Sequence, residues 1–598
     1  MAIHYTVAPS NPAAHIFTVT LRVDAPDPEG QVFRLPGWIP GSYLVREFAK
    51  NIVQIEARDS STSLVPLSKI DKATWKAAKT VGPLTLRYEV YAWDLSVRMA
   101  HLDQTHGYFN GTSLFLEVVG QSEQPHTVEL EAPADPLCKD WRVATTLPEL
   151  EAPRYGFGSY QAPDYDALID HPVEMGSFEL VTFEAAGVPH DLAVTGIHRG
   201  DLQRLVQDLE PICAHQIKMF GEPAPMDRYL FQLMVVGNGY GGLEHRASTS
   251  LIAKRDDLPM PGEHGVSEGY RNLLGLCSHE YFHTWNVKRI KPAAFVPYDL
   301  STENYTTLLW AFEGITSYYD DLVLCRTERI DVKSYLELVG RTITRVRKGS
   351  GRHKQSLAES SFDAWTKFYR QDENAPNAIV SYYAKGSLAA LALDLTLRLH
   401  TEGKVTLDDV MRTLWADYGS KGIGVPEDGI EKVAQELSGA DLSEFFDQAV
   451  RGTEDLPLGP LLAAFGVRLS FRPAKDGSDK GGSVVKDLSK LRAKGQIGAS
   501  FSGRKLRNVY DDGAAQLAGL SAGDELVAID GVKAVKPESQ LAAYPPGSVV
   551  QLHAFRRDEL ITREVTLDAP TEHCAVLEVD EDADEQVIAR RVRWLKGL

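Results

Sequence analysis

Two histidines four residues apart, His279 and His283, flank a glutamate in the stretch "LCSHEYFHTWNVKRIKP" (276–292). Side chains at positions i and i+4 lie on the same face of an α-helix, so the two imidazoles can bind one metal ion. Glu280 follows the first histidine directly, where its carboxylate can take a proton from a water molecule beside the metal. The spacing therefore predicts a zinc site that carries its own general base.

The residues around this motif argue against an ordinary helix with a solvated polar face. Leucines and aromatic residues surround it: Leu273, Leu274, Leu276, Tyr281, Phe282 and Trp285. A helix with such flanks is expected to be buried, and three polar side chains on a buried helix need partners. A bound cation supplies them.

A catalytic zinc site needs a third protein ligand and keeps a fourth position open. Glu303 lies 20 residues after His283, in the polar stretch "DLSTENYTT", and Glu313 lies 30 residues after it, in the apolar stretch "WAFEGITSYYDDLVL". A carboxylate on a buried helix must be paired or bound to a metal, whereas one in a polar loop need not be. The sequence favours Glu313 and leaves Glu303 as the alternative.

A glycine-rich stretch, "GNGYGGLEHRAST", follows an apolar run at 229–236 that reads as a strand. Gly237, Gly239 and Gly242 match a dinucleotide-binding fingerprint, which requires a helix to begin at the last glycine. The residues that follow, "LEHRASTSLIA", alternate like a strand instead. The glycines more simply allow a substrate to approach the backbone, which makes Gly242 a candidate substrate-binding residue.

The bulk composition bounds the class of protein. The chain has 598 residues, 43% of them hydrophobic and 24% charged, which is typical of a soluble protein with several domains. Its net charge of −19 argues against binding to nucleic acid or to an anionic membrane. No leader peptide or membrane-spanning run is visible, and the five scattered cysteines form no C-x-x-C pair. A cytoplasmic location is expected.

Five segments follow from the patterning. Residues 1–172 contain alternating runs such as "HIFTVTLRV" and predict an all-β sandwich. Strands then give way to helices over 173–455, which is expected to be an α+β to all-helical catalytic domain. The range 456–484 includes "KDGSDKGGS" and is predicted to be a linker. A small domain is expected at 485–570, and 571–598 forms a tail with a terminal helix.

"HEYFH" followed by "WAFEGITSYY" resembles the gluzincin metallopeptidases of the aminopeptidase N clan. "WNVKRIKP" is similar to one branch of that clan, the glycyl aminopeptidases, which carry a C-terminal PDZ domain. The resemblance implies a thermolysin-like fold for residues 173–455, one Zn²⁺ per chain and a third ligand at Glu313. The interval 284–312 is longer than is usual in the clan, which implies an inserted loop near "IKPAAFVPYDLS". Glu303 therefore stays a rival, because its spacing resembles that of thermolysin-type enzymes.

Two further segments extend the resemblance. "VSYYAKGSL" matches the clan's Y-x-K-G segment and implies that Tyr383 hydrogen-bonds the oxyanion of the reaction. "GGLEH" stands where the clan has the glutamate that binds the free α-amine of the substrate, which implies that role for Glu244. His245 replaces the usual asparagine there, so the resemblance does not imply which contact the residue after Glu244 makes with the substrate. The resemblance implies an aminopeptidase that acts on peptides with a free N-terminus, with a preference for glycine or alanine.

The segment "GAAQLAGLSAGDELVAIDG" (513–531) resembles part of a PDZ domain. PDZ domains bind peptides by adding a strand to a sheet edge. The loop "GASF" at 498–501 departs from the usual G-L-G-F, so recognition of a C-terminal carboxylate stays open, and a purely structural module is equally compatible. Two other functions remain: an endopeptidase with the same zinc site, or a non-catalytic scaffold that binds peptides through this module.

Overall fold

The computed structural model describes residues 3–597, which divide into two compact units. The first unit is Met1–Asn304 with Trp415–Gly424, and the second is Tyr305–Leu414 with Val425–Leu598. None of the helices within residues 3–597 combines the length and the apolar character needed to cross a membrane.

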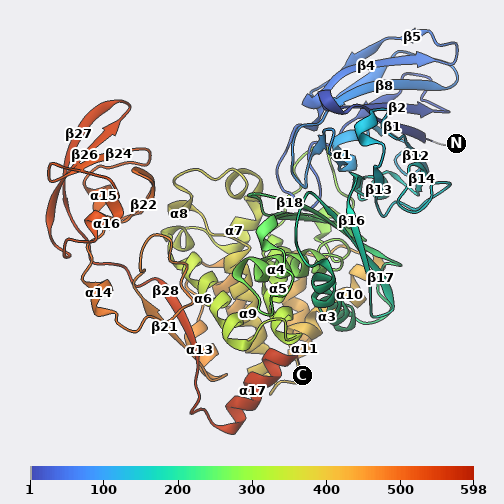
Figure 1. Ribbon diagram of the computed structural model, residues 1–598. Coiled ribbons are helices and arrows are strands. Elements are labelled where there is room, and N and C mark those ends of the chain that lie inside the picture. Colours follow the sequence, from blue (N-terminus) through green and yellow to red (C-terminus); the bar gives the residue numbers. More distant parts are fainter. Residues whose placement is uncertain (1–2, 598) are drawn as a thin grey trace. The chain divides into compact units, whose positions relative to one another are not determined.

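The first unit begins with a β-rich domain, drawn in blue in Figure 1. Apolar and polar residues alternate along its strands, so that one face of each sheet lies on a shared hydrophobic core. Its three sheets consist of β14 (Gly158–Ala162), β12 (His126–Leu130), β1 (Ile3–Asn11), β2 (Ile16–Val23), β8 (Leu84–Tyr91), β4 (Ile52–Asp59) and β5 (Leu64–Val65); β13 (Arg142–Ala144), β15 (Val173–Gly176), β10 (His106–Phe109) and β9 (Ala100–Leu102); and β11 (Glu117–Val118), β3 (Val32–Arg34), β7 (Thr74–Ala77) and β6 (Leu67–Lys69). The prediction of a β-rich N-terminal domain is confirmed, and its last strand, β15, ends four residues beyond position 172.

A five-stranded mixed sheet completes the first unit. Its strands are β16 (Glu179–Ala185), β17 (Val188–Thr195), β18 (Tyr229–Val236), β20 (Ser248–Lys254) and β19 (Gly241–Glu244), in that order across the sheet. Helix α3 (Leu202–Phe220) packs on β16, and helix α4 (Glu268–Phe282) packs on α3, β19 and β20. Helix α4 starts where the Ser267 hydroxyl accepts a hydrogen bond from the Tyr270 amide at 3.1 Å.

Strand β19 lies within the glycine-rich stretch, begins at Gly241 and runs antiparallel to β20. The residues after Gly242 are therefore β-structure, as the alternation predicts, but they form parts of two strands joined by a turn at 245–247 and not one continuous strand. A phosphate-binding helix does not begin there, which removes the dinucleotide interpretation.

The second unit starts with a π-helical turn, η6 (Trp310–Gly314), that continues into α5 (Ile315–Arg326). The main helices that follow are α6 (Val332–Arg347), α9 (Ala384–His400), α10 (Leu407–Asp417, whose last turn belongs to the first unit) and α11 (Gly429–Ser438). Helix α9 packs against η6, α5 and α6. The two charges that interrupt its apolar sequence pair with each other, because Asp394 lies 3.1 Å from Arg398 in the buried core.

The predicted catalytic domain, 173–455, is divided between the two units rather than forming one of them. The five-stranded sheet shares apolar contacts with the N-terminal domain, because Ala144 and Phe178 pack with Ala193 and Leu230. The first unit extends from the N-terminal sheets to residue 304, so the predicted boundaries at 172 and 455 do not describe the compact units.

The prediction of a linker over 456–484 is wrong for most of its length. This range contains helix α13 (Leu458–Ala463) and strand β21 (Val467–Arg472), and β21 pairs with β28 (Cys574–Val579) from the predicted tail. Even the Gly- and Asp-rich part is fixed, because Asp479 forms a buried ion pair with Arg472 at 2.6 Å. The expected terminal helix is present as α17 (Glu585–Lys596), which packs on α5.

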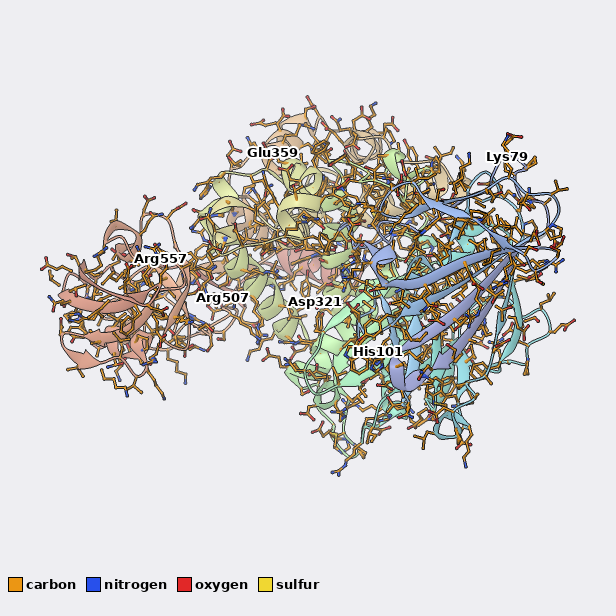
Figure 2. All side chains as sticks on the ribbon, turned by 90° about the horizontal axis from the view of Figure 1, so that it is seen from above. Lys79, His101, Asp321, Glu359, Arg507 and Arg557 are labelled. Carbon is orange, nitrogen blue, oxygen red and sulfur yellow. The ribbon has the colours of Figure 1, made fainter. Side chains whose placement is uncertain are left out.

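A small module between β21 and β28 has a hydrophobic core of its own. Its strands are β22 (Ala499–Ser502), β23 (Lys505–Val509), β24 (Glu525–Ile529), β26 (Val549–Arg556) and β27 (Glu559–Thr566), with β25 (Val532–Lys533) beside β24; its helices are α15 (Ala514–Leu517) and α16 (Pro537–Leu541). Strand β22 pairs only with β23 among the described strands, so it forms an edge of this sheet. Arg507 and Arg557 of this module are labelled in Figure 2.

Candidate active site

Helix α4 places the two histidines of the H-E-x-x-H motif close together at its C-terminal end. The rings of His279 and His283 have centroids 4.7 Å apart and planes at 88°. The Nδ1 atom of His283 lies 2.6 Å from the backbone oxygen of Asn286, so Nδ1 donates this bond and Nε2 keeps its lone pair for an ion. Part of the "WNVKRIKP" stretch thus serves to orient the second histidine.

Two buried carboxylates lie next to His283. Ligand atoms of Glu244, Glu280 and His283 all lie within 4.8 Å of one another. The Oε1 atom of Glu244 is buried and has no hydrogen-bond partner among the described residues. An ionised carboxylate in such a position is costly unless a cation is near. This cluster of imidazole nitrogens and carboxylate oxygens fits a site for Zn²⁺ and for a cationic substrate group.

Gly242 lies against the side chain of Glu280. A Cβ atom built on Gly242 would be 2.1 Å from Oε1 of Glu280, far inside van der Waals contact. From the sequence, Gly242 is expected to let the substrate approach the backbone. In the structure, the group nearest to Gly242 is the carboxylate of Glu280, the predicted general base. The Glu280 carboxylate therefore occupies the space that a side chain at position 242 of strand β19 would fill.

We expect Gly242→Ala to reduce kcat about tenfold or more without unfolding the protein. The added methyl group must displace the Glu280 carboxylate, and misplacement of a catalytic group by about 1 Å can cost a hundredfold in rate. Steady-state kinetics on a dipeptide substrate measure the effect, and circular dichroism checks the fold. Gly237→Ala is the matched control, because a Cβ atom there meets nothing within 4 Å. Equal activity of the two variants would contradict the assignment.

Gly41 of the N-terminal domain contacts the other carboxylate and was missed by sequence reasoning. Its φ angle is +93°, and a Cβ atom on it would be 2.4 Å from Oε1 of Glu244. The segment "LPGWIPGSY" signalled only a turn, since nothing local links it to a glutamate about 200 residues later. The N-terminal domain therefore contacts the carboxylate of Glu244 directly.

The loop expected as an insertion after "IKP" packs on the same N-terminal segment. The indole nitrogen of Trp38 donates to the backbone oxygens of Asp299 and Thr302 at 3.0 and 2.8 Å. The Gly37 amide donates to the Leu300 oxygen at 2.7 Å. These contacts fix the loop within the first unit.

Glu303, the rival third ligand, lies on this loop and is half-exposed. Its Oε2 atom accepts a hydrogen bond from the Thr302 hydroxyl at 3.1 Å. It belongs to none of the described clusters whose ligand atoms lie within 4.8 Å of one another, although it shares a unit with both histidines. The geometry of the first unit therefore disfavours Glu303.

A buried ion pair supports the strand that carries Glu244. Lys288 Nζ lies 2.7 Å from Asp170 Oδ1, and the same carboxylate accepts the Arg246 amide at 3.0 Å. Burial alone would raise the pKa of Asp170, but Lys288 and Arg246 outweigh it and hold this pKa well below its usual range. His245, which stands where the clan has asparagine, also lies 3.3 Å from Asp170. Asp170 was not predicted, although the basic residues after the helix imply an acidic partner.

In the second unit, the two segments that resemble motifs of the clan, W-x-x-E-G and Y-x-K-G, meet at their glycines. A Cβ atom on Gly314, next to Glu313, would be 2.6 Å from the Cα atom of Gly386 in helix α9. The W-x-x-E-G and Y-x-K-G segments therefore cross at a distance that only glycine allows. Glu313 is 1% exposed and lies in the π-helical turn, a feature that is frequent at functional sites.

Tyr383 immediately precedes helix α9, and its hydroxyl lies 3.5 Å from that of Tyr369. Burial, followed by the nearby Glu313, raises the pKa of Tyr383 well above its usual value. The phenol therefore stays protonated at neutral pH and can donate a hydrogen bond. Glu313 and Tyr383 are thus electrostatic neighbours within the second unit.

Comparison with known proteins places the chain in a family. The model of the Peptidase M61 N-terminal domain matches residues 4–177, and that of the M61 glycyl aminopeptidase matches 272–389. An aminopeptidase N family protein from Idiomarina loihiensis shares 44% sequence identity, with a TM-score of 0.94 and coverage of 99% of this chain and 100% of that one. An M1 zinc metallopeptidase from Deinococcus radiodurans gives 15% identity and a TM-score of 0.48, covering 76% and 94% of the two chains. The search of curated proteins found no match.

Because the 44% identity extends over the whole length of the Idiomarina protein, and because both M61 domains occur in order, the chain belongs to the aminopeptidase N family and carries the domains of an M61 glycyl aminopeptidase.

Proposed function

We propose that this protein is a zinc-dependent aminopeptidase that removes single residues from the free N-terminus of peptides. The observation that carries the proposal is the buried Glu244, whose Oε1 has no hydrogen-bond partner within residues 3–597 and which lies beside Glu280 and His283. The α-amino group of a peptide is mostly protonated at neutral pH and so supplies a cation that can pair with the Glu244 carboxylate. Anchoring the ammonium there sets the first peptide bond against the general base.

His279, His283 and Glu313 would hold one Zn²⁺ per chain. Two imidazoles and one carboxylate form a ligand set that is common in catalytic zinc sites. The burial of Glu313 in a π-helical turn and the separate position of Glu303 support this choice of third ligand. When bound, the ion supplies Lewis acidity and lowers the pKa of water.

The remaining steps belong to side chains of the protein. Glu280 accepts a proton from the attacking water and delivers it to the leaving amine. The Tyr383 hydroxyl donates a hydrogen bond to the oxyanion that forms on the scissile carbonyl. Glu244 holds the α-ammonium and so sets which bond is cleaved. A preference for N-terminal glycine or alanine is part of this proposal and is supported by the match to the glycyl aminopeptidase model.

N-acetylation should make a peptide a very poor substrate. It removes the positive charge that Glu244 binds and adds an acetyl group in the same space. Truncating one partner of a buried charge pair costs about 2 kcal/mol or more, so kcat/KM should fall about thirtyfold or further. Turnover of one peptide with a free and an acetylated N-terminus measures this effect.

Glu244→Gln should lower the activity on the free peptide by a similar factor while zinc content stays unchanged. Because the variant has lost the selective charge, it should also discriminate less between the two peptides. If the wild-type enzyme cleaves both peptides equally, or cuts long peptides internally, the chain is an endopeptidase with the same zinc site.

A second candidate function is binding of extended peptides by the C-terminal module, as in PDZ domains. A cavity of about 1540 Å³ runs along the edge strand β22 and helix α16 and is closed on its other side by residues 345–353 and 375–384 of the same unit. Edge strands can accept an added strand through their free backbone groups. We infer that this cavity receives the part of a long substrate beyond the scissile bond.

Replacing residues 485–570 by a short Gly/Ser linker should leave zinc content and dipeptide hydrolysis unchanged. The cut must be internal, because β28 and α17 pack on α6 and α5 and would be lost in a simple truncation. Hydrolysis of peptides of about ten residues should weaken, seen as a higher KM. An equal effect on dipeptides and long peptides would contradict peptide binding by the module.

A further inference from the structure

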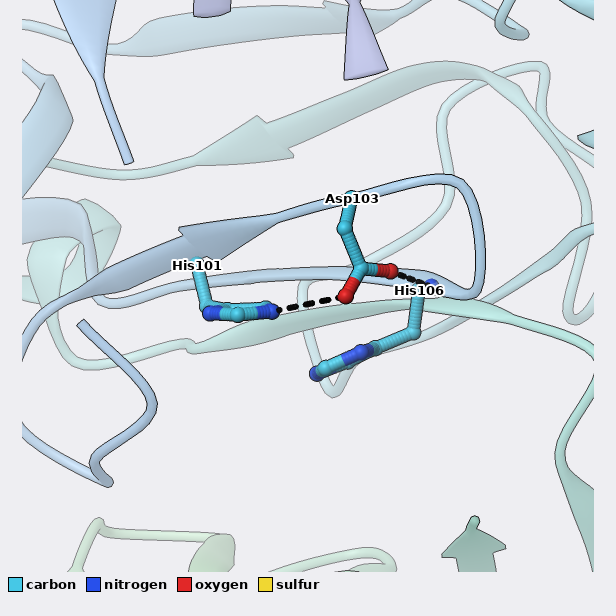
Figure 3. Close-up of side chains that lie close together, drawn as sticks. All are labelled: His101, Asp103 and His106. Carbon is cyan, nitrogen blue, oxygen red and sulfur yellow. Dashed lines mark hydrogen bonds and ion pairs between the residues drawn. The ribbon is translucent and has the colours of Figure 1, made fainter. Parts of the chain in front are cut away.

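A hairpin of the N-terminal domain brings together two histidines and an aspartate far from the residues of helix α4 in sequence. His101 lies on β9, His106 begins β10, and Asp103 lies in the turn between them. Figure 2 labels His101 on this domain, and Figure 3 shows the two imidazole rings on either side of the Asp103 carboxylate, with a dashed line from the carboxylate to His101. One ligand atom from each of the three residues lies within 4.8 Å of the other two.

The turn fixes the direction of the Asp103 carboxylate. Its Oδ1 atom accepts hydrogen bonds from the amides of Thr105 and His106 at 2.6 and 3.1 Å and from the Thr105 hydroxyl at 2.5 Å. Its Oδ2 atom is left to face Nε2 of His101 at 3.3 Å. Burial would raise the pKa of Asp103, but these hydrogen bonds lower it to about 2, so the carboxylate is charged at neutral pH.

Both imidazoles are more than nine-tenths buried, His101 at 5% exposed and His106 at 2%. Burial lowers the pKa of His106 to about 4 and also lowers that of His101, so both rings are neutral and keep a lone pair. The Nδ1 atom of each ring is buried and has no hydrogen-bond partner among the described residues. Polar atoms in this condition are uncommon in folded proteins and need an explanation.

We propose that His101, Asp103 and His106 bind one divalent transition-metal ion, of the class that prefers imidazole and carboxylate ligands, at a site separate from the active site. Zinc, cobalt, nickel and copper belong to this class. Atoms bound to one tetrahedral ion at about 2.1 Å lie about 3.4 Å apart, so the three groups must close by at most about 1.4 Å. The two rings are stacked, with centroids 4.7 Å apart and planes at 22°. Their nitrogen atoms can therefore point at one ion only if the rings rotate as well as move closer.

An aromatic residue beside the cluster provides an optical signal. Trp93 is 52% exposed and stacks on His101 with centroids 4.9 Å apart. Nickel and copper ions quench the fluorescence of a nearby tryptophan. Binding at this hairpin should therefore remove the emission of Trp93 and leave most of the emission of the other tryptophans.

The test is zinc binding by the full-length protein after removal of metal with a chelator. Equilibrium dialysis followed by elemental analysis should find two Zn²⁺ per chain in the wild type. The His101→Gln and His106→Gln variants should bind one and keep their aminopeptidase activity. A variant with His279→Ala and His283→Ala should also bind one. Ni²⁺ should quench part of the tryptophan fluorescence of this variant, and this loss should disappear when Trp93→Phe is added.

Two controls keep the test decisive. Asp103→Asn preserves the turn, because the amide oxygen still accepts the backbone hydrogen bonds, but it should weaken the second zinc at least tenfold. His4→Gln removes another histidine that faces an aspartate, Asp24 at 3.5 Å, in the same domain and should still bind two ions. The proposal is overturned if the variant with His279→Ala and His283→Ala binds no Zn²⁺, or if the folded His106→Gln and Asp103→Asn variants bind as many Zn²⁺ ions as the wild type and bind them as tightly. These outcomes do not depend on whether the enzyme is an aminopeptidase.

Discussion

The Glu280→Gln variant should keep its metal but lose at least about 99% of its turnover, because general acid–base catalysis contributes a hundredfold or more. Glutamine has the shape of glutamate but cannot accept the proton of the attacking water. The variant also keeps the side-chain volume that fits against Gly242, so the surrounding strand need not move. Elemental analysis and kcat on a dipeptide give the two readouts.

The two readouts distinguish a general base from a metal ligand. Retained zinc with lost turnover supports the proposed role, whereas loss of zinc would mean that Glu280 binds the ion directly. A variant with both zinc and wild-type turnover would remove Glu280 from the mechanism. Thr302→Ala, which changes only the hydroxyl bonded to Glu303, should have no effect on either readout.

Glu313→Ala should release the metal and abolish activity, whereas Glu303→Ala should change neither. Removing one of three protein ligands lowers zinc affinity steeply, and the two remaining histidines cannot replace a carboxylate. Glu303 is half-exposed and bonded to Thr302 in the first unit, so its loss should cost little. Zinc content after dialysis against a weak chelator measures both variants.

The opposite pattern would change the assignment of the site. If Glu303→Ala loses its zinc and Glu313→Ala keeps it, the third ligand is Glu303 on the loop after helix α4, at the spacing that resembles thermolysin-type enzymes. Glu313→Gln is a useful companion, because it keeps the side chain in the π-helical turn and separates loss of the ligand from loss of packing.

The parts of the site that lie within one helix or strand could be predicted from the sequence. The spacing of His279 and His283 and the apolar residues around them predicted helix α4. The alternation of apolar and polar residues after Gly242 predicted β-structure there instead of a phosphate-binding helix. In these cases the signal and the structure depend on residues within one turn or one strand, which is the range over which sequence patterns act.

The contacts that complete the pocket join residues distant in the chain and had no local signal. Gly41 lies against Glu244, and Lys288 reaches Asp170, across separations of about 100 to 200 residues. The linker prediction failed for a related reason. "VRLSFR" alternates like a strand, but its partner β28 lies about 100 residues later, beyond a complete module. Composition alone therefore gave too much weight to the glycines near Asp479.

The contact between Gly41 and Glu244 has a consequence for how such enzymes diverge. If the N-terminal sheets were exchanged for those of a relative, the recombined protein could fold and still change its tolerance for the first residue of a peptide. Any residue larger than glycine at position 41 would press on the Glu244 carboxylate, which we propose binds the amine of the substrate. A change in the N-terminal domain can therefore alter the range of substrates even though the proposed catalytic residues, Glu280 and Tyr383, lie outside that domain.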